Sequence, residues 1–395
     1  MRRVPTNSFY TGQWGLLRSA LSLGGEKDIS AFEEAFADYI GVKRAFLVGS
    51  GTSALFIILK ALKKLHRGRE VVLPAYTVPT LTLAIERAGL TTRLSDIDIN
   101  TFNLDTKRLG EATSTDTLAV LPVHMFGFPM DLSEVLRRAG REGFCVIEDC
   151  AQAPGAEMSG KRVGGGSGVG FFSMCKGKII STFRGGVITA SDPDIAREIE
   201  REIESMPTPG VLFNTVLFAA LFLMNYATSP TVYGPLFRLI EPFKSTEVHE
   251  HFEPTLATPF AARLGNIQIE AIGDQIGRRI ENGKTLYNAL KEIEGVTLPA
   301  IIDGASPSYN HLPVMIEEGE RIEHIARLLL ERGIDTARMY ERPIHKIYHL
   351  GYPDTTDPFP EATRLSERLM VLPVHPGVTG RDLETILETF RKIFS

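Results

Sequence analysis

Two lysines that closely follow a strand-like run are the first candidates for chemistry in this sequence. Lys176 and Lys178 stand in the segment GFFSMCKGKIISTFRGG. A lysine amine that is partly desolvated can form an imine with a carbonyl cofactor. Two lysines this close together are also typical of a solvated surface, so the pair alone leaves both interpretations open.

A pair of carboxylates upstream favours the chemical interpretation. The segment VIEDCAQAPGA contains an apolar run that ends in Glu148 and Asp149. The C-terminal ends of parallel strands are where open α/β sheets bind ligands. Asp149 could pair with a pyridinium nitrogen while a lysine reaches the aldehyde carbon, the combination that pyridoxal 5′-phosphate requires. Taken alone, either acid could equally be an ordinary turn or cap residue.

A third motif could hold an anion. In GSGTSAL, the residues Gly49 to Ser53 follow an apolar strand and precede a helical pattern. Backbone N–H groups at a helix start, with hydroxyls beside them, form an anion site. An N-cap turn without a ligand would use the same residue types.

Other motifs carry no comparable signal. GAEMSGKR, which ends at Arg162, lacks the Ser or Thr that a nucleotide-binding P-loop places there for magnesium. GGGSGVG, which ends at Gly170, lacks the dinucleotide spacing and leads into a strand. His124 and His375 are isolated in the sequence and are interpreted as structural, so no metal site is predicted.

The elements that must position these motifs alternate along the chain. From about residue 30 to 200, short apolar runs alternate with helical patterns, which is typical of a parallel α/β sheet. The predicted strands cover residues 45–48, 70–73, 92–94, 118–123, 144–147, 170–173 and 186–189. A long helical region at 254–293 and a second α/β pattern from 294 follow. We therefore predict a large domain over residues 1–253, a connecting helical region and a small C-terminal domain over 294–395.

Composition is that of a folded protein with small-molecule partners. Hydrophobic residues make up 43% of the 395 residues and charged residues 23%. The net charge of -5 argues against a nucleic-acid partner, because phosphates require a basic face. The three cysteines lack the paired spacing of a zinc site or a secreted scaffold, and no signal peptide is evident at the N-terminus. These features predict a cytoplasmic location.

Together, in order, these motifs resemble a known family. GSGTSAL, VLPAYTVPT, VHMFG, EDCAQAPGA, FSMCKGK and RGG are similar to motifs of the DegT/DnrJ/EryC1/StrS family of sugar aminotransferases. The resemblance extends to GIDTARMYERPIH and LSERLMVLPVHPGVTGRDL near the C-terminus. It implies the fold type I architecture of pyridoxal-phosphate-dependent transferases: a large domain with a mostly parallel sheet and helices on both faces, and a small α/β domain. It also implies a homodimer, because the family's active sites form at the subunit interface.

The resemblance assigns roles residue by residue. It implies that Lys178, and not Lys176, carries the cofactor as a Schiff base and serves as general base. It implies that Asp149 pairs with the pyridine nitrogen and that Gln152 lies near the cofactor hydroxyl. The phosphate positions match three residues with Ser53 beside them: Gly51, Thr52 and Ser173.

Several positions depart from the family pattern. Val78 stands where many members place an aromatic residue over the cofactor ring, and Tyr76 could compensate. The Asn-Tyr-Arg segment that sends an asparagine to the partner's cofactor phosphate aligns with residues 254–256, which read Pro-Thr-Leu. Pro154 replaces a common histidine, and Phe183-Arg184 replaces the usual Gly-Glu before the paired glycines.

An apolar insert at about 207–243 is also unusual for the family. Its most apolar part, VLFNTVLFAALFLM at 211–224, is shorter than the ~20 residues of a membrane-spanning helix. The insert could pack within the dimer, cover the active site, or lie on a membrane through residues 211–240. The last case would associate the protein with the inner face of the membrane.

These observations predict an aminotransferase. The predicted reaction moves an amino group from an amino acid, glutamate or glutamine, to a nucleotide-linked keto sugar, in cell-surface polysaccharide or related biosynthesis. A lipid-linked or hydrophobic keto substrate met at the membrane is the alternative, and a non-catalytic regulator that binds the cofactor is a third. The family's dehydratase branch has histidine in place of the Schiff-base lysine, and Lys178 argues against it.

Overall fold

The computed structural model describes residues 2–8, 25–207, 223, 227, 232–235, 251–353 and 356–394. The hypotheses about the apolar insert fall almost entirely outside these residues. Within the described chain, none of the helices is long and apolar enough to cross a membrane.

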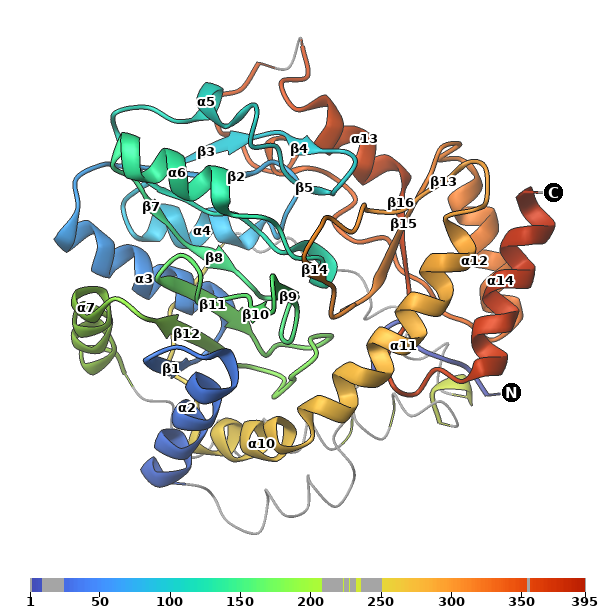
Figure 1. The fold of residues 1–395 in the computed structure, drawn as a ribbon, viewed down its shortest axis with the longest axis horizontal. Coiled ribbons are helices and arrows are strands. Elements are labelled where there is room, and N and C mark those ends of the chain that lie inside the picture. Colours follow the sequence, from blue (N-terminus) through green and yellow to red (C-terminus); the bar gives the residue numbers. More distant parts are fainter. Residues whose placement is uncertain are drawn as a thin grey trace.

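A single twisted sheet forms the centre of the large domain (Figure 1). Two groups of hydrogen-bonded strands, β1-β12-β11-β8 and β3-β2-β6-β7, are joined because β7 continues into β8 with only Ile147 between them. Strand β12 runs antiparallel to both of its neighbours, and the other described pairings in this sheet are parallel. The strands are β1 (Arg44–Val48), β2 (Glu70–Pro74), β3 (Thr91–Ser95), β6 (Thr117–Val120), β7 (Cys145–Val146), β8 (Glu148–Asp149), β11 (Val169–Ser173) and β12 (Gly186–Ala190). All except β8 overlap one of the predicted strands, and β8 directly continues the predicted strand at 144–147. The mostly parallel architecture is confirmed.

Helices cover both faces of this sheet. Successive side chains of a strand point to opposite faces of the sheet. If alternate residues of a strand lie in two different cores, both faces of the sheet are buried. In β1, Phe46 and Val48 belong to the core under α3, whereas Ala45 and Leu47 belong to the core under α2. The helices of the large domain are α2 (Glu26–Ile40), α3 (Gly51–Leu65), α4 (Thr80–Arg87), α5 (Leu109–Ala112), α6 (Ser133–Glu142) and α7 (Pro193–Glu204).

The C-terminal part is a smaller α/β unit beside the large sheet (Figure 1). Its antiparallel sheet has the order β13-β15-β16, from Val296–Thr297, Leu312–Ile316 and Leu369–Leu372. Helices α12 (Arg321–Glu331), α13 (Pro360–Arg368) and α14 (Gly380–Phe394) accompany it. Helices α10 (Pro259–Glu270) and α11 (Ile272–Leu290) occupy the predicted connecting region. The exact domain bounds stay a prediction.

Short elements link the two units near the end of β11. Strand β14 (Ala305–Ser306) pairs with β9 (Glu157–Met158), which pairs with β10 (Lys161–Arg162). The remaining short elements are β4 (Ile97–Asp98), β5 (Asn103–Leu104) and the 3₁₀ turns η1 (Met125–Gly127) and η3 (Ile344–Lys346). The N-terminal residues also join the C-terminal unit, because Val4 forms a parallel bridge with Ile334. Segments distant in sequence therefore pair within and between the two units.

Candidate active site

The start of α3 forms a cradle for an anion. Ser50 caps this helix, and its hydroxyl accepts a hydrogen bond from the Ser53 amide at 3.0 Å. None of the described residues accepts a hydrogen bond from the amides of Gly51 and Thr52. Ser173 ends β11 directly beside this turn, since a Cβ on Gly51 would lie 3.0 Å from the Ser173 Cβ. The predicted phosphate residues are thus brought together at a helix N-terminus, where partial positive charge favours an anion.

Ser53 has a different role in this arrangement. Its side chain is fully buried, and its hydroxyl lies 2.9 Å from the Ser50 hydroxyl. The same hydroxyl accepts a hydrogen bond from the Thr255 amide at 3.2 Å, while the Gly49 amide donates to the Thr255 carbonyl at 2.8 Å. Ser53 therefore supports the turn that carries the anion site, through its contacts with Ser50 and Thr255. The Pro-Thr-Leu segment, where the family has Asn-Tyr-Arg, packs here on its own subunit's turn.

Asp149 is buried at the C-terminal end of β8. Its carboxylate is held by the amide of Ala151 at 2.9 Å, and only 2% of the residue is exposed. Burial raises the pKa of Asp149 from 3.8 to about 6, against the opposing effects of the Ala151 amide and the Lys178 charge. No cation forms an ion pair with Asp149 among the described residues. The carboxylate is therefore positioned by the backbone and lacks a counter-charge in direct contact.

Lys178 lies in the turn that follows β11. Its amide donates to the Cys175 carbonyl at 3.3 Å. Burial lowers the pKa of the Lys178 amine, and the charge of Asp149 opposes this effect. Lys176, two residues earlier, is exposed. The structure thus distinguishes the two lysines. Lys178 is partly buried and interacts with the charge of Asp149, whereas Lys176 is exposed to solvent.

Gln152 completes the group of predicted cofactor residues. It follows Asp149 by three residues and is 2% exposed. Its Nε2 lies 3.3 Å from the sulfur of Met125 and 3.3 Å from the hydroxyl of Tyr340. Its carbonyl oxygen Oε1 is buried and has no hydrogen-bond partner within the described part of the chain. An unsatisfied buried acceptor is costly, and it is consistent with a ligand at this position.

Val78 and Tyr76 stand on the loop after β2. Val78 is half-buried and packs against the main core. Tyr76 is fully buried, its hydroxyl donates to the Met339 carbonyl, and its ring meets Tyr340 edge-on at 5.8 Å. Tyr76 thereby links the large domain to the C-terminal unit.

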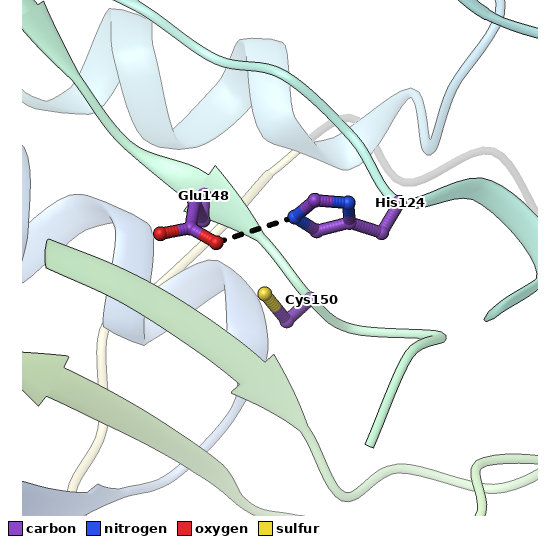
Figure 2. A group of neighbouring side chains, drawn as sticks. All are labelled: His124, Glu148 and Cys150. Atoms are coloured by element: carbon purple, nitrogen blue, oxygen red, sulfur yellow. Dashed lines mark hydrogen bonds and ion pairs between the residues drawn. The ribbon is translucent and has the colours of Figure 1, made fainter. Parts of the chain in front are cut away.

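A buried cluster lies behind Asp149, as Figure 2 shows for His124, Glu148 and Cys150. The His124 Nδ1 accepts from the Met130 amide at 3.0 Å, so Nε2 carries the proton and faces Glu148 at 3.3 Å. The two Glu148 oxygens also accept backbone amides of residues 164 and 167, each at 2.7 Å. Burial alone would raise the pKa of Glu148, but these hydrogen bonds bring it below its ordinary value.

The same cluster has the composition of a metal site, because its ligand atoms lie within 4.8 Å of one another. Its hydrogen bonds account for both His124 nitrogens and both Glu148 oxygens. Burial raises the pKa of the Cys150 thiol well above its ordinary value, which disfavours the thiolate that binds metals. The arrangement is that of a structural network that supports the Asp149 strand.

Three residues near Lys178 were not predicted from the sequence. The buried His311 contacts Asn310 Nδ2 through Nδ1 at 2.8 Å and Asn7 Oδ1 through Nε2 at 2.7 Å. Asn7 in turn approaches the lysine turn, since a Cβ on Gly177 would lie 2.9 Å from its Oδ1. Burial, and then the charges of Arg279 and Lys178, lower the pKa of His311 well below 6.5. The chain therefore holds a neutral imidazole close to Lys178.

Arg279 is the third of these residues. It is 4% exposed, and its Nη1 donates to the Asn310 carbonyl at 3.0 Å. Burial lowers the pKa of Arg279 to about 10. The sequence showed only an arginine within a helical pattern. These residues could have been predicted only from an alignment of the family that showed a histidine just before β15 and an arginine on α11.

Comparison with known proteins identifies the family. The sequence model of one protein family matches residues 15–211 and 257–391, most of the chain. The chain belongs to the DegT/DnrJ/EryC1/StrS aminotransferase family. The interval between the two matched ranges contains most of the apolar insert.

Relatives match most or part of the chain. The erythromycin biosynthesis sensory transduction protein EryC1 of Saccharopolyspora erythraea is 28% identical over 91% of this chain and 88% of its own length. The dTDP-3-amino-3,6-dideoxy-alpha-D-galactopyranose transaminase of Aneurinibacillus thermoaerophilus is 28% identical over 94% and 90%. The GDP-perosamine synthase of Caulobacter vibrioides is 40% identical, over 43% of this chain and 46% of its own length.

Solved structures support the same fold. DesV of S. venezuelae superimposes over 100% of this chain and 99% of its own, with a TM-score of 0.79 and 24% identity. Helicobacter pylori PseC, an aminotransferase involved in the biosynthesis of pseudoaminic acid, covers 100% and 99% with a TM-score of 0.80 and 19% identity. The predicted fold type I architecture is confirmed.

One departure from the family pattern has a structural consequence. Phe183 replaces a glycine of the family motif, and its φ is +69°, in the left-handed region that favours glycine. A bulky residue in this conformation stores strain, which the surrounding structure must hold in place. The loop that follows Lys178 therefore holds a phenylalanine in a conformation that glycine adopts without strain.

Proposed function

We propose that this protein binds pyridoxal 5′-phosphate on Lys178 and transfers an amino group from an amino acid to a keto sugar. The observation that carries the proposal is the pairing of the buried Asp149 carboxylate with the partly buried Lys178 amine. The Lys178 amine has a lowered pKa, and the Asp149 carboxylate has a raised pKa and no cation in contact. The two groups affect each other's charge without forming an ion pair.

The described residues fit this cofactor at three points. The amides of Gly51 and Thr52 and the nearby Ser173 can hold its phosphate. Asp149 lacks a counter-charge that a pyridinium nitrogen would supply. The unsatisfied Gln152 Oε1 lies three residues beyond, where a ring hydroxyl would satisfy it. When bound, this cofactor supplies a carbonyl for attachment and a ring that accepts electrons.

The chain's own residues would act in distinct ways. The lowered pKa increases the neutral fraction of the Lys178 amine, and a neutral amine can attack a carbonyl and later accept a proton as general base. Asp149, held by the Ala151 amide, would keep the ring nitrogen protonated. The His124–Glu148 network holds the strand beneath Asp149 in position.

The substrate class follows from the family. The named relatives include transaminases of dTDP-linked sugars and a GDP-perosamine synthase. We therefore propose a nucleotide-linked keto sugar as acceptor and glutamate or glutamine as donor, in cell-surface polysaccharide or related biosynthesis. We also propose a homodimer as the active form.

The two neighbouring lysines offer a matched test of the attachment site. The purified protein would be treated with borohydride, which fixes an imine as a stable secondary amine, and the labelled peptide would be identified by mass spectrometry. We expect the label on Lys178, and an absorbance band of the bound cofactor that disappears in Lys178→Ala but persists in Lys176→Ala.

The outcomes separate the possible errors. A wild-type protein that binds no pyridoxal phosphate would contradict the whole proposal. A label on Lys176 would retain the cofactor and move its attachment. A labelled protein that does not convert glutamate to 2-oxoglutarate in the presence of a nucleotide-linked keto sugar would contradict the proposed substrates alone.

A further inference from the structure

The segment from Ala337 to Ile344 crosses from the C-terminal unit to the large domain. At its start, Ala337 forms an antiparallel bridge with Val371 of β16. At its end, the Ile344 amide donates to the Ala75 carbonyl of the large domain at 2.9 Å. Between these two anchors, the segment places Tyr340 against Gln152 in the candidate site.

The backbone of Tyr340 is unusual for its residue type. Its φ is +52°, in the left-handed region that a bulky side chain rarely adopts. Two contacts of Tyr76 stabilise this conformation: its hydroxyl donates to the Met339 carbonyl, and its ring packs edge-on against the Tyr340 ring. Such conformations persist where the surrounding structure fixes them, and they cluster at functional sites.

The hydrogen bonds around the Tyr340 hydroxyl are incomplete. Gln152 Nε2 donates to the hydroxyl oxygen at 3.3 Å and also faces the Met125 sulfur at 3.3 Å. Because a thioether can only accept, the sulfur fixes which end of the amide points toward Tyr340. The Tyr340 proton then has no acceptor among the described residues, and Gln152 Oε1 has no donor.

The charges nearby keep this hydroxyl protonated. Burial, and then the neighbouring Asp149 carboxylate, raise the pKa of Tyr340 well above 10. The Tyr340 hydroxyl is therefore a donor without an acceptor, and the neighbouring Gln152 Oε1 is an acceptor without a donor, among the described residues. An oxygen that accepts would satisfy the Tyr340 hydroxyl, and in its protonated hydroxyl form it would also donate to Gln152 Oε1.

We propose that Tyr340 is a further cofactor-binding residue, whose hydroxyl donates a hydrogen bond to the ring oxygen of pyridoxal phosphate beside Gln152. This inference rests on the proposed cofactor. A hydroxyl of the sugar substrate has the same chemistry and is the competing source of that oxygen.

The consequence concerns the ionisation of the bound cofactor. A hydrogen bond to the ring oxygen favours the form in which this oxygen carries more negative charge, which is the form with the lysine-linked nitrogen unprotonated. Removal of the donor should therefore raise the pKa of the cofactor's absorbance band by about one pH unit, a roughly tenfold change in the equilibrium.

The test compares Tyr340→Phe with wild type and with Tyr287→Phe. Phenylalanine at 340 keeps the ring against Tyr76 and removes only the hydroxyl. Tyr287 is a matched control, because it lies on α11 and its hydroxyl donates to the Pro299 carbonyl and not toward Gln152. The absorbance band would be titrated with pH in the absence of substrates. Cofactor release would be measured by dilution into an excess of an apo-enzyme that traps released pyridoxal phosphate.

We expect the band pKa to rise by about one unit and cofactor release to accelerate about tenfold in Tyr340→Phe alone. An unchanged band with a raised KM for the keto sugar would overturn the inference and assign Tyr340 to the substrate. No change in either quantity would also overturn it. Both results presuppose a wild-type band that Lys178→Ala abolishes, so failure of the proposed function itself would be recognised separately.

Discussion

Replacement of Asp149 by asparagine should make the cofactor-free protein more stable at neutral pH, although it should abolish activity. The side chain is 2% exposed, and burial raises its pKa from 3.8 to about 6. The folded state therefore binds a proton more tightly than the unfolded state. Above about pH 6 the folded protein carries the buried negative charge of Asp149, which lowers the free energy of unfolding.

The magnitude follows from linkage. Between pH 3.8 and about 6 the folded state binds more protons than the unfolded state, so the free energy of unfolding falls as pH rises. The difference of about two pH units corresponds to ~3 kcal/mol at ~1.4 kcal/mol per unit. The contribution is fully favourable below pH 3.8 and lost above about pH 6.

The assay is urea unfolding of cofactor-free wild type and Asp149→Asn at equal protein concentration. Asparagine can keep the hydrogen bond from the Ala151 amide, because its Oδ1 remains an acceptor. We expect Asp149→Asn to gain about 3 kcal/mol relative to wild type between pH 4 and pH 7.5. Saturating pyridoxal phosphate should reverse the order, since only the carboxylate pairs with the pyridinium charge.

Asp382→Asn provides a control of opposite sign. Burial of Asp382 by itself raises its pKa, but hydrogen bonds from Arg2 and Thr379 bring it below 3.8. Its contribution is therefore present at neutral pH and lost as the pH falls below 3.8, so this variant should be destabilised at pH 7.5. An Asp149→Asn variant whose stability relative to wild type does not change with pH would refute the argument that burial governs this carboxylate.

Three further predictions concern the surroundings of the site. Gly51→Ala should weaken cofactor binding at least tenfold, measured by titration with pyridoxal phosphate, because the new Cβ lies 3.0 Å from the Ser173 Cβ in the phosphate cradle. Glu148→Gln should lower the free energy of unfolding by ~2 kcal/mol at pH 7, because it weakens charge-assisted bonds with His124 and two amides; because the pKa of Glu148 is lowered, the loss should shrink as the pH falls below the ordinary carboxylate pKa. Phe183→Gly should raise the free energy of unfolding by ~1 kcal/mol in urea, since glycine adopts φ +69° without strain; an unchanged or lower value would show that the ring's contacts outweigh the strain.

Local patterns predicted much of the fold, because strands and helices have different periods. The seven apolar runs predicted as strands each lie on an observed strand, and the helix after GSGTSAL begins at Gly51. Each of these features depends on a few consecutive residues. A strand buried on both faces is a short apolar run, and a helix start needs a cap such as Ser50.

Long-range contacts could not be predicted in this way. Nothing in the sequence around Asn7, His311 or Tyr340 indicated that these side chains approach the turn or strand that carries Lys178 and Asp149. Their positions depend on how the C-terminal unit and the N-terminal residues dock on the large sheet. The Tyr340–Gln152 and His311–Asn7 contacts join residues 188 and 304 positions apart, and no local periodicity encodes them.

The sequence by itself determined the residue types, their order and the family resemblance, and these were enough to single out Lys178 and Asp149. The tertiary structure decided which of these groups are buried, and burial is the physical cause of the raised pKa of Asp149 and the lowered pKa of Lys178. It also decided that Ser53 faces Thr255 and that Tyr340 reaches Gln152. Desolvation and hydrogen bonding depend on what surrounds a group in space, and only the packed chain specifies those surroundings.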